Sequence, residues 1–328
     1  MILVTGAAGF IGSNLVAELA ANAEGSIVAC DSMDDGDKWR NLAKHEVTEM
    51  VNPSDLFSFL NKYGNSIDLI FHMGAISSTT ETNVDLIIKN NFQLSLDLWN
   101  WCAANEVKFI YASSAATYGD GGRDFDDDGS CEALAKLSPM NAYGWSKHLF
   151  DRRVARVVAD GGKQPPQWVG LKFFNVYGPN EYHKGSQQSV ISQIFKQIME
   201  TKKAKLFQSH NANYEDGGQL RDFIWVGDCV DVMIWLSKHP SVSGLFNCGT
   251  GRARSFKELA EAVFASLDKE PKIIYVPTPD IIRDKYQYFT QAKMERLRLA
   301  GYTGKSTSLE KGVKKYVSEY LLSTDPYR

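Results

Sequence analysis

The sequence predicts an α/β fold in which helices cover both faces of a doubly wound parallel sheet. Short apolar runs rich in β-branched residues alternate with longer helix-like segments over the first half of the chain. Such runs are typical of parallel strands buried on both faces, and their alternation with helices indicates crossover connections. The first run leads directly into a glycine-rich turn, and the chain shows no internal repeat.

The first strand is expected at 1–5, and the glycine-rich turn GAAGFIG follows at 6–12. A helix from 10 to 21 would direct its N-terminal amides and its dipole at a pyrophosphate group. The second strand is expected at 26–30, and Asp31 follows it directly. At this place a carboxylate meets the ribose hydroxyls of a dinucleotide. The glycine spacing differs from the Gly-x-Gly-x-x-Gly of simple dehydrogenases. With this strand, helix and carboxylate around it, the turn still predicts a Rossmann-type dinucleotide site.

Later segments continue the alternation. We expect strands at 69–72, 108–112 and 168–173, and helices at 84–104 and around Tyr143. The Gly-Pro pair at 178–179 should break regular structure. The runs 221–226 and 245–249 look like strands that return to the sheet, whereas the acidic stretch 124–128 is expected to be a solvated loop.

These positions predict two lobes that interleave in sequence. The dinucleotide-binding domain is expected at 1–174, with returns at about 220–250 and 284–297. The smaller α/β substrate-binding lobe is expected at 175–219, 251–283 and 298–328.

Composition narrows the class of partner. The chain has 328 residues, 44% of them hydrophobic, and a formal net charge of -3, so it offers no basic field for nucleic acid. No run approaches the ~18 to 20 apolar residues that span a bilayer. A strand that starts at Ile2 leaves no room for a signal peptide, so a cytoplasmic protein is expected. The five cysteines are dispersed, without Cys-x-x-Cys or a His cluster, and predict no metal site.

Tyr143 and Lys147 are four residues apart, so on a helix they share one face. A free tyrosine titrates near ~10, and lowering its pKa to neutrality takes about 3 units, or roughly 4 kcal/mol. The Lys147 ammonium and a positively charged nicotinamide would supply this stabilisation. With Ser114 and the glycine-rich turn, the pair predicts an enzyme that transfers hydride.

The kind of nicotinamide is less constrained by the sequence. Asp31 would repel a 2′-phosphate, whereas Lys38 and Arg40, a few residues later, would attract one. The balance favours NADP, and NAD stays open.

Four features occur together: the glycine-rich turn, Ser113 with Ser114, the pair Tyr143 and Lys147, and NVYGP at 175–179. They resemble the extended short-chain dehydrogenase/reductase superfamily acting on nucleotide sugars, and the resemblance covers nearly the whole chain. Four more specific strings are GAISSTTE at 74–81, YASSAATYG at 111–119, HKGS at 183–186 and YQYFTQ at 286–291. By these strings the chain is similar to the ADP-L-glycero-D-manno-heptose 6-epimerase family within the superfamily.

This resemblance implies inversion of C6 of the heptose by transient oxidation to a 6-keto sugar with bound NADP. By the same resemblance, the catalytic tyrosine falls on Tyr143 and the second acid/base group on Lys184. Two such groups are wanted because one base cannot easily serve both faces of one carbon. Ser114 would orient the substrate, and Lys147 would hold the nicotinamide ribose. The family also implies a homo-oligomer, specifically a pentamer, and a role in lipopolysaccharide biosynthesis.

The resemblance also assigns binding residues. Expected cofactor contacts are Gly6, Gly9, Phe10, Ile11, Gly12, Asp31, Ser32, Lys38, Met73, Gly74, Ala75, Ile76, Ser77, Asn90, Lys147, Val176 and Lys184. Expected substrate contacts are Ser114, Asn175, Ser186, Gln193, Phe207, Gln208, Ser209, His210, Arg221 and Tyr286. The Arg221 guanidinium suits paired phosphate oxygens. Two positions depart from the family: Pro53 replaces a cofactor lysine, which weakens the case for NADP, and Gln193 replaces a substrate histidine.

Other functions stay open at this point. A UDP-hexose 4-epimerase shares Ser114, Tyr143 and Lys147, and it is the main alternative. A nucleotide-sugar 4,6-dehydratase typically has an acidic pair after the serine, where this chain has Ala115 and Ala116. A cofactor-binding redox regulator without activity is the non-enzyme alternative, and the intact Ser/Tyr/Lys set opposes it.

Overall fold

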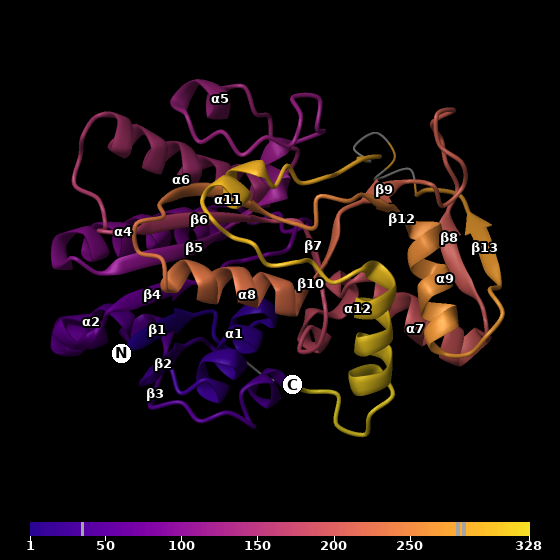
Figure 1. Ribbon diagram of the computed structural model, residues 1–328, viewed down its shortest axis with the longest axis horizontal. Coiled ribbons are helices and arrows are strands. Elements are labelled where there is room, and N and C mark those ends of the chain that lie inside the picture. Colours follow the sequence, from indigo (N-terminus) through magenta and orange to yellow (C-terminus); the bar gives the residue numbers. More distant parts are fainter. Residues whose placement is uncertain (34–35, 280–282, 284–286) are drawn as a thin grey trace.

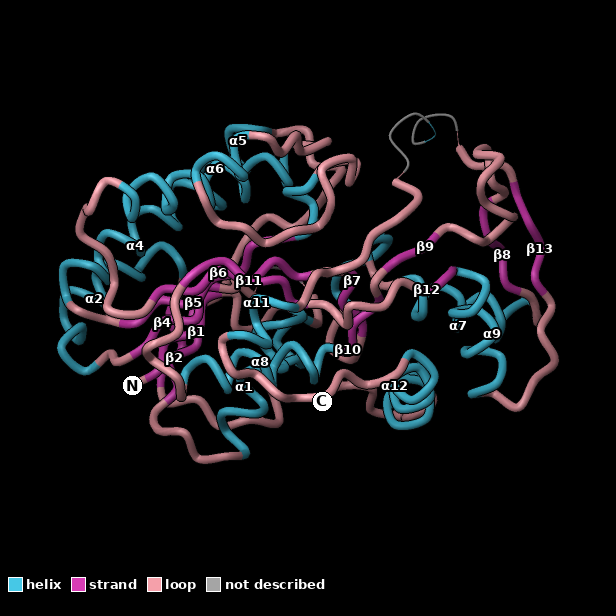
Figure 2. The backbone as a smooth tube through the Cα atoms, turned by 45° about the horizontal axis from the view of Figure 1, so that its top comes forward, coloured by secondary structure: helices cyan, strands magenta, loops and turns pink. Residues whose placement is uncertain are grey.

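The computed structural model describes residues 1–33, 36–279, 283 and 287–328. Figures 1 and 2 show a layered body around one large sheet and, beside it, a second group of helices and short strands. Among the described residues, seven parallel strands form the main sheet, in the order β11-β6-β5-β4-β1-β2-β3. They are β1 (Ile2–Thr5), β2 (Ile27–Cys30), β3 (Glu49–Val51), β4 (Leu69–His72), β5 (Lys108–Ser114), β6 (Trp168–Phe173) and β11 (Gly244–Cys248). The expected α/β class with a doubly wound parallel sheet is confirmed.

The strand order reverses between β1 and β4, which pair from Ile2 with Leu69 to Thr5 with His72. In open parallel sheets this switch point opens a crevice at the carboxyl ends of the strands, where ligands bind. The fold therefore directs attention to the residues that follow Thr5 and His72.

Successive side chains of each strand enter different cores, because strand residues alternate between faces. Val4 packs in one core with α1 and α8, whereas Leu3 packs in another with α2, α4 and α6. Figure 2 shows α4 and α6 on one side of the strands and α1 and α8 on the other. The helices are α1 (Phe10–Ala21), α2 (Leu56–Tyr63), α3 (Val84–Ile87), α4 (Leu94–Asn105), α5 (Cys131–Ala135), α6 (Ala142–Ala159), α8 (Val226–Ser237) and α11 (Glu295–Leu299).

The second group of elements has its own apolar core, in which Ile194, Val263 and Val313 are buried. Its helices are α7 (Val190–Thr201), α9 (Phe256–Ser266) and α12 (Leu309–Tyr316), and the π-helical η7 (Val317–Leu321) continues the last one. Three strand pairs complete it: β8 (Ala204–Phe207) with β13 (Ile273–Val276), β9 (Leu220–Arg221) with β12 (Arg254–Ser255), and β7 (Asn175–Tyr177) with β10 (Phe223–Trp225). We call this group the small lobe.

Short helical segments fill several connections. They are η1 (Lys38–Asn41), η2 (Pro53–Asp55), η3 (Gly64–Ser66), η4 (Ile88–Gln93), η5 (Ala115–Tyr118) and η6 (Tyr182–Gln187). Within the described ranges, no helix is long and apolar enough to cross a membrane.

Most local expectations are confirmed: α1, β4 and β6 have the expected bounds, and the helix expected at 84–104 runs through α3, η4 and α4. The expectation that 221–226 returns to the main sheet is wrong. This segment forms β9 and β10, which pair with β12 and β7, and Val226 already begins α8. The reason is tertiary, since β7 follows β6 after a break at Phe174 and offers β10 a partner outside the main sheet. The expected domain boundaries stay a prediction.

Candidate active site

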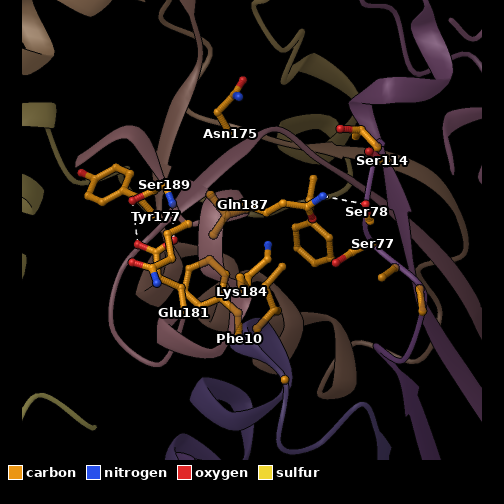
Figure 3. Close-up of a pocket in the computed structure, with 18 of the residues that line it drawn as sticks. Phe10, Ser77, Ser78, Ser114, Asn175, Tyr177, Glu181, Lys184, Gln187 and Ser189 are labelled. Carbon is orange, nitrogen blue, oxygen red and sulfur yellow. Dashed lines mark hydrogen bonds between the residues drawn. The ribbon is translucent and has the colours of Figure 1, made fainter. Parts of the chain in front are cut away.

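A cavity of about 880 Å³ opens at the carboxyl ends of β1, β4 and β5 and reaches the small lobe (Figure 3). It therefore lies at the switch point of the sheet. Many residues predicted from the sequence line it: Gly6, Gly9, Phe10, Ile11, Gly12, Asp31, Lys38, Met73, Gly74, Ala75, Ile76, Ser77, Ser114, Tyr143, Lys147, Asn175, Val176, Lys184 and Ser186.

The glycine-rich turn brings main chain into close contact at the floor of this cavity. Gly6 has φ +65°, and a Cβ atom there would lie 2.6 Å from the backbone of Gly74. A Cβ atom at Gly12 would lie 2.1 Å from the Gly6 carbonyl oxygen. Only glycine allows this packing, which leaves the N-terminus of α1 at the cavity. The cradle fits the pyrophosphate of a dinucleotide.

Asp31 closes the same side of the cavity. Its carboxylate accepts a hydrogen bond of 2.9 Å from the Ala8 amide and one of 2.7 Å from the Lys38 ammonium. Lys38 also donates to the carbonyl oxygen of Ser32 at 2.9 Å. Ser32 thus contributes through its main chain and does not line the cavity. A carboxylate and an ammonium group are both available where the adenosine ribose is expected.

Tyr143 lies in the first turn of α6, which begins where the Asn141 side chain accepts a hydrogen bond from the Gly144 amide at 2.8 Å. A Cβ atom at Gly144 would lie 2.6 Å from the Ala116 carbonyl oxygen, so α6 packs closely on the segment that follows Ser114. This contact brings Ser114 and Tyr143 within hydrogen-bonding distance.

Burial shifts the pKa values of both Tyr143 and Lys147. The expected lowering of the Tyr143 pKa by Lys147 and a bound nicotinamide stays a prediction. Burial raises the pKa of Tyr143, and the hydrogen bond with Ser114 lowers it. Burial lowers the pKa of Lys147 to about 8, which leaves the ammonium as its main form near neutrality. The carboxylate of Asp151, one turn later on α6, opposes that effect.

Asp151 itself belongs to a buried polar network that the sequence analysis missed. It accepts hydrogen bonds from Lys172 and Ser113, both at 2.7 Å, and from Tyr111 at 3.0 Å. Asp151 and Lys172 are fully buried. The signal for Asp151 was its place four residues after Lys147, on the same helix face. The network ties α6 to β5 and β6 beneath the Ser/Tyr/Lys set.

Lys184 reaches the cavity from η6. Its ammonium lies 5.7 Å from the centroid of the Phe10 ring, and Figure 3 shows it pointing into the interior of the cavity. Burial lowers the pKa of Lys184, and the charge of Glu181 opposes this effect.

Further polar residues of the lining were not predicted. Gln187 donates a hydrogen bond of 2.7 Å to the Ser78 hydroxyl, which joins η6 to the loop after β4 across the cavity (Figure 3). Thr79, Thr80 and Glu181 also line it. Ser78, Thr79 and Thr80 directly follow the predicted residue Ser77, and this polar run was the sequence signal that could have indicated them.

Some predicted residues lie away from this lining. They are Ser32, Asn90, Gln193, Phe207, Gln208, Ser209, His210 and Arg221. Asn90 donates to the Leu86 carbonyl at 2.8 Å, and Gln193 donates to the Gln188 carbonyl at 2.8 Å. The segment Phe207 to His210 starts at the last residue of β8 in the small lobe, and Tyr286 lies outside the described residues. The binding roles expected for these residues stay predictions.

Arg221 is 9% exposed and its guanidinium donates to the carbonyl groups of Leu220 and Gln287. The neighbouring carboxylate of Asp222 accepts hydrogen bonds from the Thr250 hydroxyl and from the amides of Gly251 and Ala292. Among the residues that the structure describes, no cluster of His, Cys, Asp and Glu could hold a metal ion.

Comparison with known proteins decides the family. The model of the NAD dependent epimerase/dehydratase family matches residues 2–249. The chain belongs to this family. It is an isomerase of the epimerase type, and its cofactor is a nicotinamide dinucleotide.

Individual relatives are consistent with this membership. The chain is 45% identical over 330 residues to an ADP-L-glycero-D-manno-heptose-6-epimerase of Nitratidesulfovibrio vulgaris, with all of both chains covered. The match to the enzyme of that name from Fusobacterium nucleatum is 44% identical and also covers both chains fully.

Two solved structures extend the comparison to three dimensions. The Helicobacter pylori ADP-L-glycero-D-manno-heptose-6-epimerase has a TM-score of 0.79 and 31% identity, covering 97% of this chain and 95% of that one. MoeE5 in complex with UDP-glucuronic acid and NAD has a TM-score of 0.74 and 26% identity, covering 97% and 99%.

Proposed function

We propose that this protein inverts C6 of ADP-D-glycero-D-manno-heptose and yields ADP-L-glycero-D-manno-heptose. The observation that carries the proposal is that Tyr143 and Lys184, from α6 and η6, line one cavity beside the glycine cradle. The full-length relatives of that name support the substrate. UDP-hexose 4-epimerase remains the second candidate, because Ser114, Tyr143 and Lys147 would serve that reaction as well.

Two acid/base groups suit an inversion, since hydride must leave one face of C6 and return to the other, and the C6 oxygen then faces a different group when it loses its hydroxyl proton and when it regains one. One of Tyr143 and Lys184 accepts this proton as C6 becomes a keto group, and the other donates a proton when the alcohol forms again. Ser114, which shares a hydrogen bond with Tyr143, would orient the substrate hydroxyl. The bound nicotinamide supplies the reversible oxidation of C6. Lys147 would hold its ribose.

We infer that the cofactor is NADP. The support is local: Lys38 neutralises Asp31 in this structure, which reduces the repulsion that a 2′-phosphate would meet. NAD is the alternative, supported by the NAD in MoeE5 and by the name of the family.

We also propose a cytoplasmic homo-oligomer, specifically the pentamer that the resemblance implies. Sedimentation velocity of the purified protein tests the assembly. A monomer at working concentrations would contradict it.

The function is tested by proton NMR of purified protein incubated with ADP-D-glycero-D-manno-heptose, without added cofactor. Appearance of the L-glycero epimer supports both the reaction and a retained cofactor. If the C6 configuration stays unchanged even with NADP or NAD supplied, the proposed substrate is wrong. UDP-, GDP- and dTDP-hexoses are then assayed in the same way.

A further inference from the structure

Glu181 is a buried carboxylate in the wall of the cavity, three residues before Lys184. Glu181 is only 1% exposed. The Lys184 amide donates a hydrogen bond of 3.0 Å to the Glu181 carbonyl oxygen, which ties the two residues into one turn. Figure 3 shows Glu181 beside Ser189, with Ser77 and Ser114 on the opposite side of Lys184.

The partners of this carboxylate are hydrogen-bond donors. Its oxygens accept from the Ser189 amide, from the Ser189 hydroxyl at 2.6 Å and from the Tyr316 hydroxyl at 2.8 Å. The Ser192 amide donates to the Ser189 hydroxyl at the start of α7, so the hydrogen of that hydroxyl is directed at Glu181. A carboxylate that accepts several such bonds is favoured in its ionised form. Burial raises the pKa of Glu181, and these hydrogen bonds together with the charge of Lys184 oppose that rise.

The other groups near Lys184 do not supply a negative charge to it. The Phe10 ring lies beneath its ammonium. Burial lowers the pKa of the adjacent His183 to about 4, so this imidazole is uncharged near neutrality. Beyond His183, Lys38 and Asp31 form an ion pair of 2.7 Å with each other.

We propose that Glu181 is a positioning residue that keeps the Lys184 side chain charged at its place in the cavity. A proton donor must hold its proton until the reaction needs it, whereas burial favours the neutral amine. The Glu181 carboxylate, anchored to α7 by Ser189 and to α12 by Tyr316, offsets that tendency from a fixed place. This role rests on the proposed function, in which Lys184 is the second acid/base.

The test compares Glu181→Gln with Tyr316→Phe. The first variant removes the charge and keeps the shape of the side chain. The second removes one hydrogen bond and leaves the charge. The readout is the pKa of Lys184, which is measured by NMR titration of protein labelled with [ε-¹³C]lysine. The Lys184→Met variant assigns the signal. We expect Glu181→Gln to lower this pKa by about one unit, and Tyr316→Phe to leave it nearly unchanged.

Kinetics provide a second readout that a purely structural role would not move. In Glu181→Gln the limb of the pH–kcat profile that follows Lys184 should move to lower pH by the same amount, with KM for the nucleotide sugar little changed. Glu181→Asp retains the charge but draws it back by one methylene, so its profile should lie between those of the wild type and Glu181→Gln.

An unchanged Lys184 pKa in folded Glu181→Gln overturns the proposal. If that variant does not fold, Glu181→Asp replaces it, because the charge is then drawn back by one methylene. A smaller fall in the Lys184 pKa supports the proposal and no fall contradicts it. The titration needs no sugar. A wild type that fails to convert the ADP-heptose would therefore refute the proposed function without deciding the role of Glu181.

Discussion

The ammonium group of Lys38 lies 2.7 Å from the carboxylate of Asp31, just after the carboxyl end of β2. The same ammonium donates to the Ser32 carbonyl at 2.9 Å, so it is held from two directions. An isolated Asp31 would favour ribose hydroxyls and repel a phosphate, whereas the pair presents both charges to the ribose end of the cavity. Cofactor choice therefore depends on the two residues together.

Replacement of Lys38 by Ala should weaken binding of NADP⁺ more than binding of NAD⁺. A hydrogen bond to a charged group contributes roughly 1.5–3 kcal/mol, so the ratio of the two affinities should change about ten- to a hundredfold. Isothermal titration calorimetry with both cofactors measures the ratio. Arg40→Ala is the control: the sequence suggested Arg40 as a second phosphate contact, but its guanidinium lies over the Tyr327 ring at 4.5 Å and the residue does not line the cavity. Equal losses for both cofactors would refute a contact with the 2′-phosphate.

Tyr143→Phe and Lys184→Met should each lower kcat by about 10²- to 10⁴-fold, the usual effect of losing a general acid or base. Folding should be preserved in both, and Tyr143→Phe should retain its affinity for the cofactor. Conversion of the ADP-heptose is followed by NMR. The controls are Tyr63→Phe on α2 and Lys205→Met on β8, whose side chains are exposed. Either cavity variant with wild-type turnover would remove that residue from the acid/base pair.

Gly12→Ala should disrupt the glycine cradle. A Cβ atom there would meet the Gly6 carbonyl oxygen at 2.1 Å, a backbone atom that cannot rotate away. Overpacking of this kind costs about 1–3 kcal/mol or more, and the displaced turn should also bind the cofactor less tightly. Urea unfolding and cofactor titration measure the two effects. At Gly129 a Cβ atom would be 3.5 Å from Leu245, so Gly129→Ala should change neither quantity.

Local patterns in the sequence indicated many residues that line the dinucleotide half of the cavity. The turn around Gly6 and Gly12, and the pair Tyr143 and Lys147, depend on residues close in sequence, so spacing alone indicates their geometry. The surroundings that set protonation were not predictable in this way. Lys172 reaches Asp151 from another strand, and the pKa of Tyr143 is raised by a burial that only the folded chain creates.

The acidic stretch at 124–128 shows the same limit, because only part of it is the solvated loop that composition suggested: Asp124, Asp126 and Asp128 are exposed, whereas Phe125 and Asp127 are buried. Asp127 is 1% exposed, and its carboxylate accepts a hydrogen bond of 2.8 Å from the Asn247 amide. The Arg296 guanidinium lies 3.8 Å away. Burial raises the pKa of Asp127 to about 6. The folded protein therefore binds this proton more tightly than the unfolded chain does.

This difference predicts a pH dependence of stability with a definite sign. The contribution of Asp127 is fully present below the unfolded pKa near ~4 and is lost as pH rises through about 6. Relative to Asp127→Asn, the wild type should lose roughly 3 kcal/mol of unfolding free energy between pH 4 and 7, since each unit is worth ~1.36 kcal/mol. Urea unfolding at several pH values measures the difference, in which groups common to both proteins cancel. A constant difference between wild type and Asp127→Asn would mean that Asp127 stays ionised in the fold, held by Asn247 and Arg296 despite its burial.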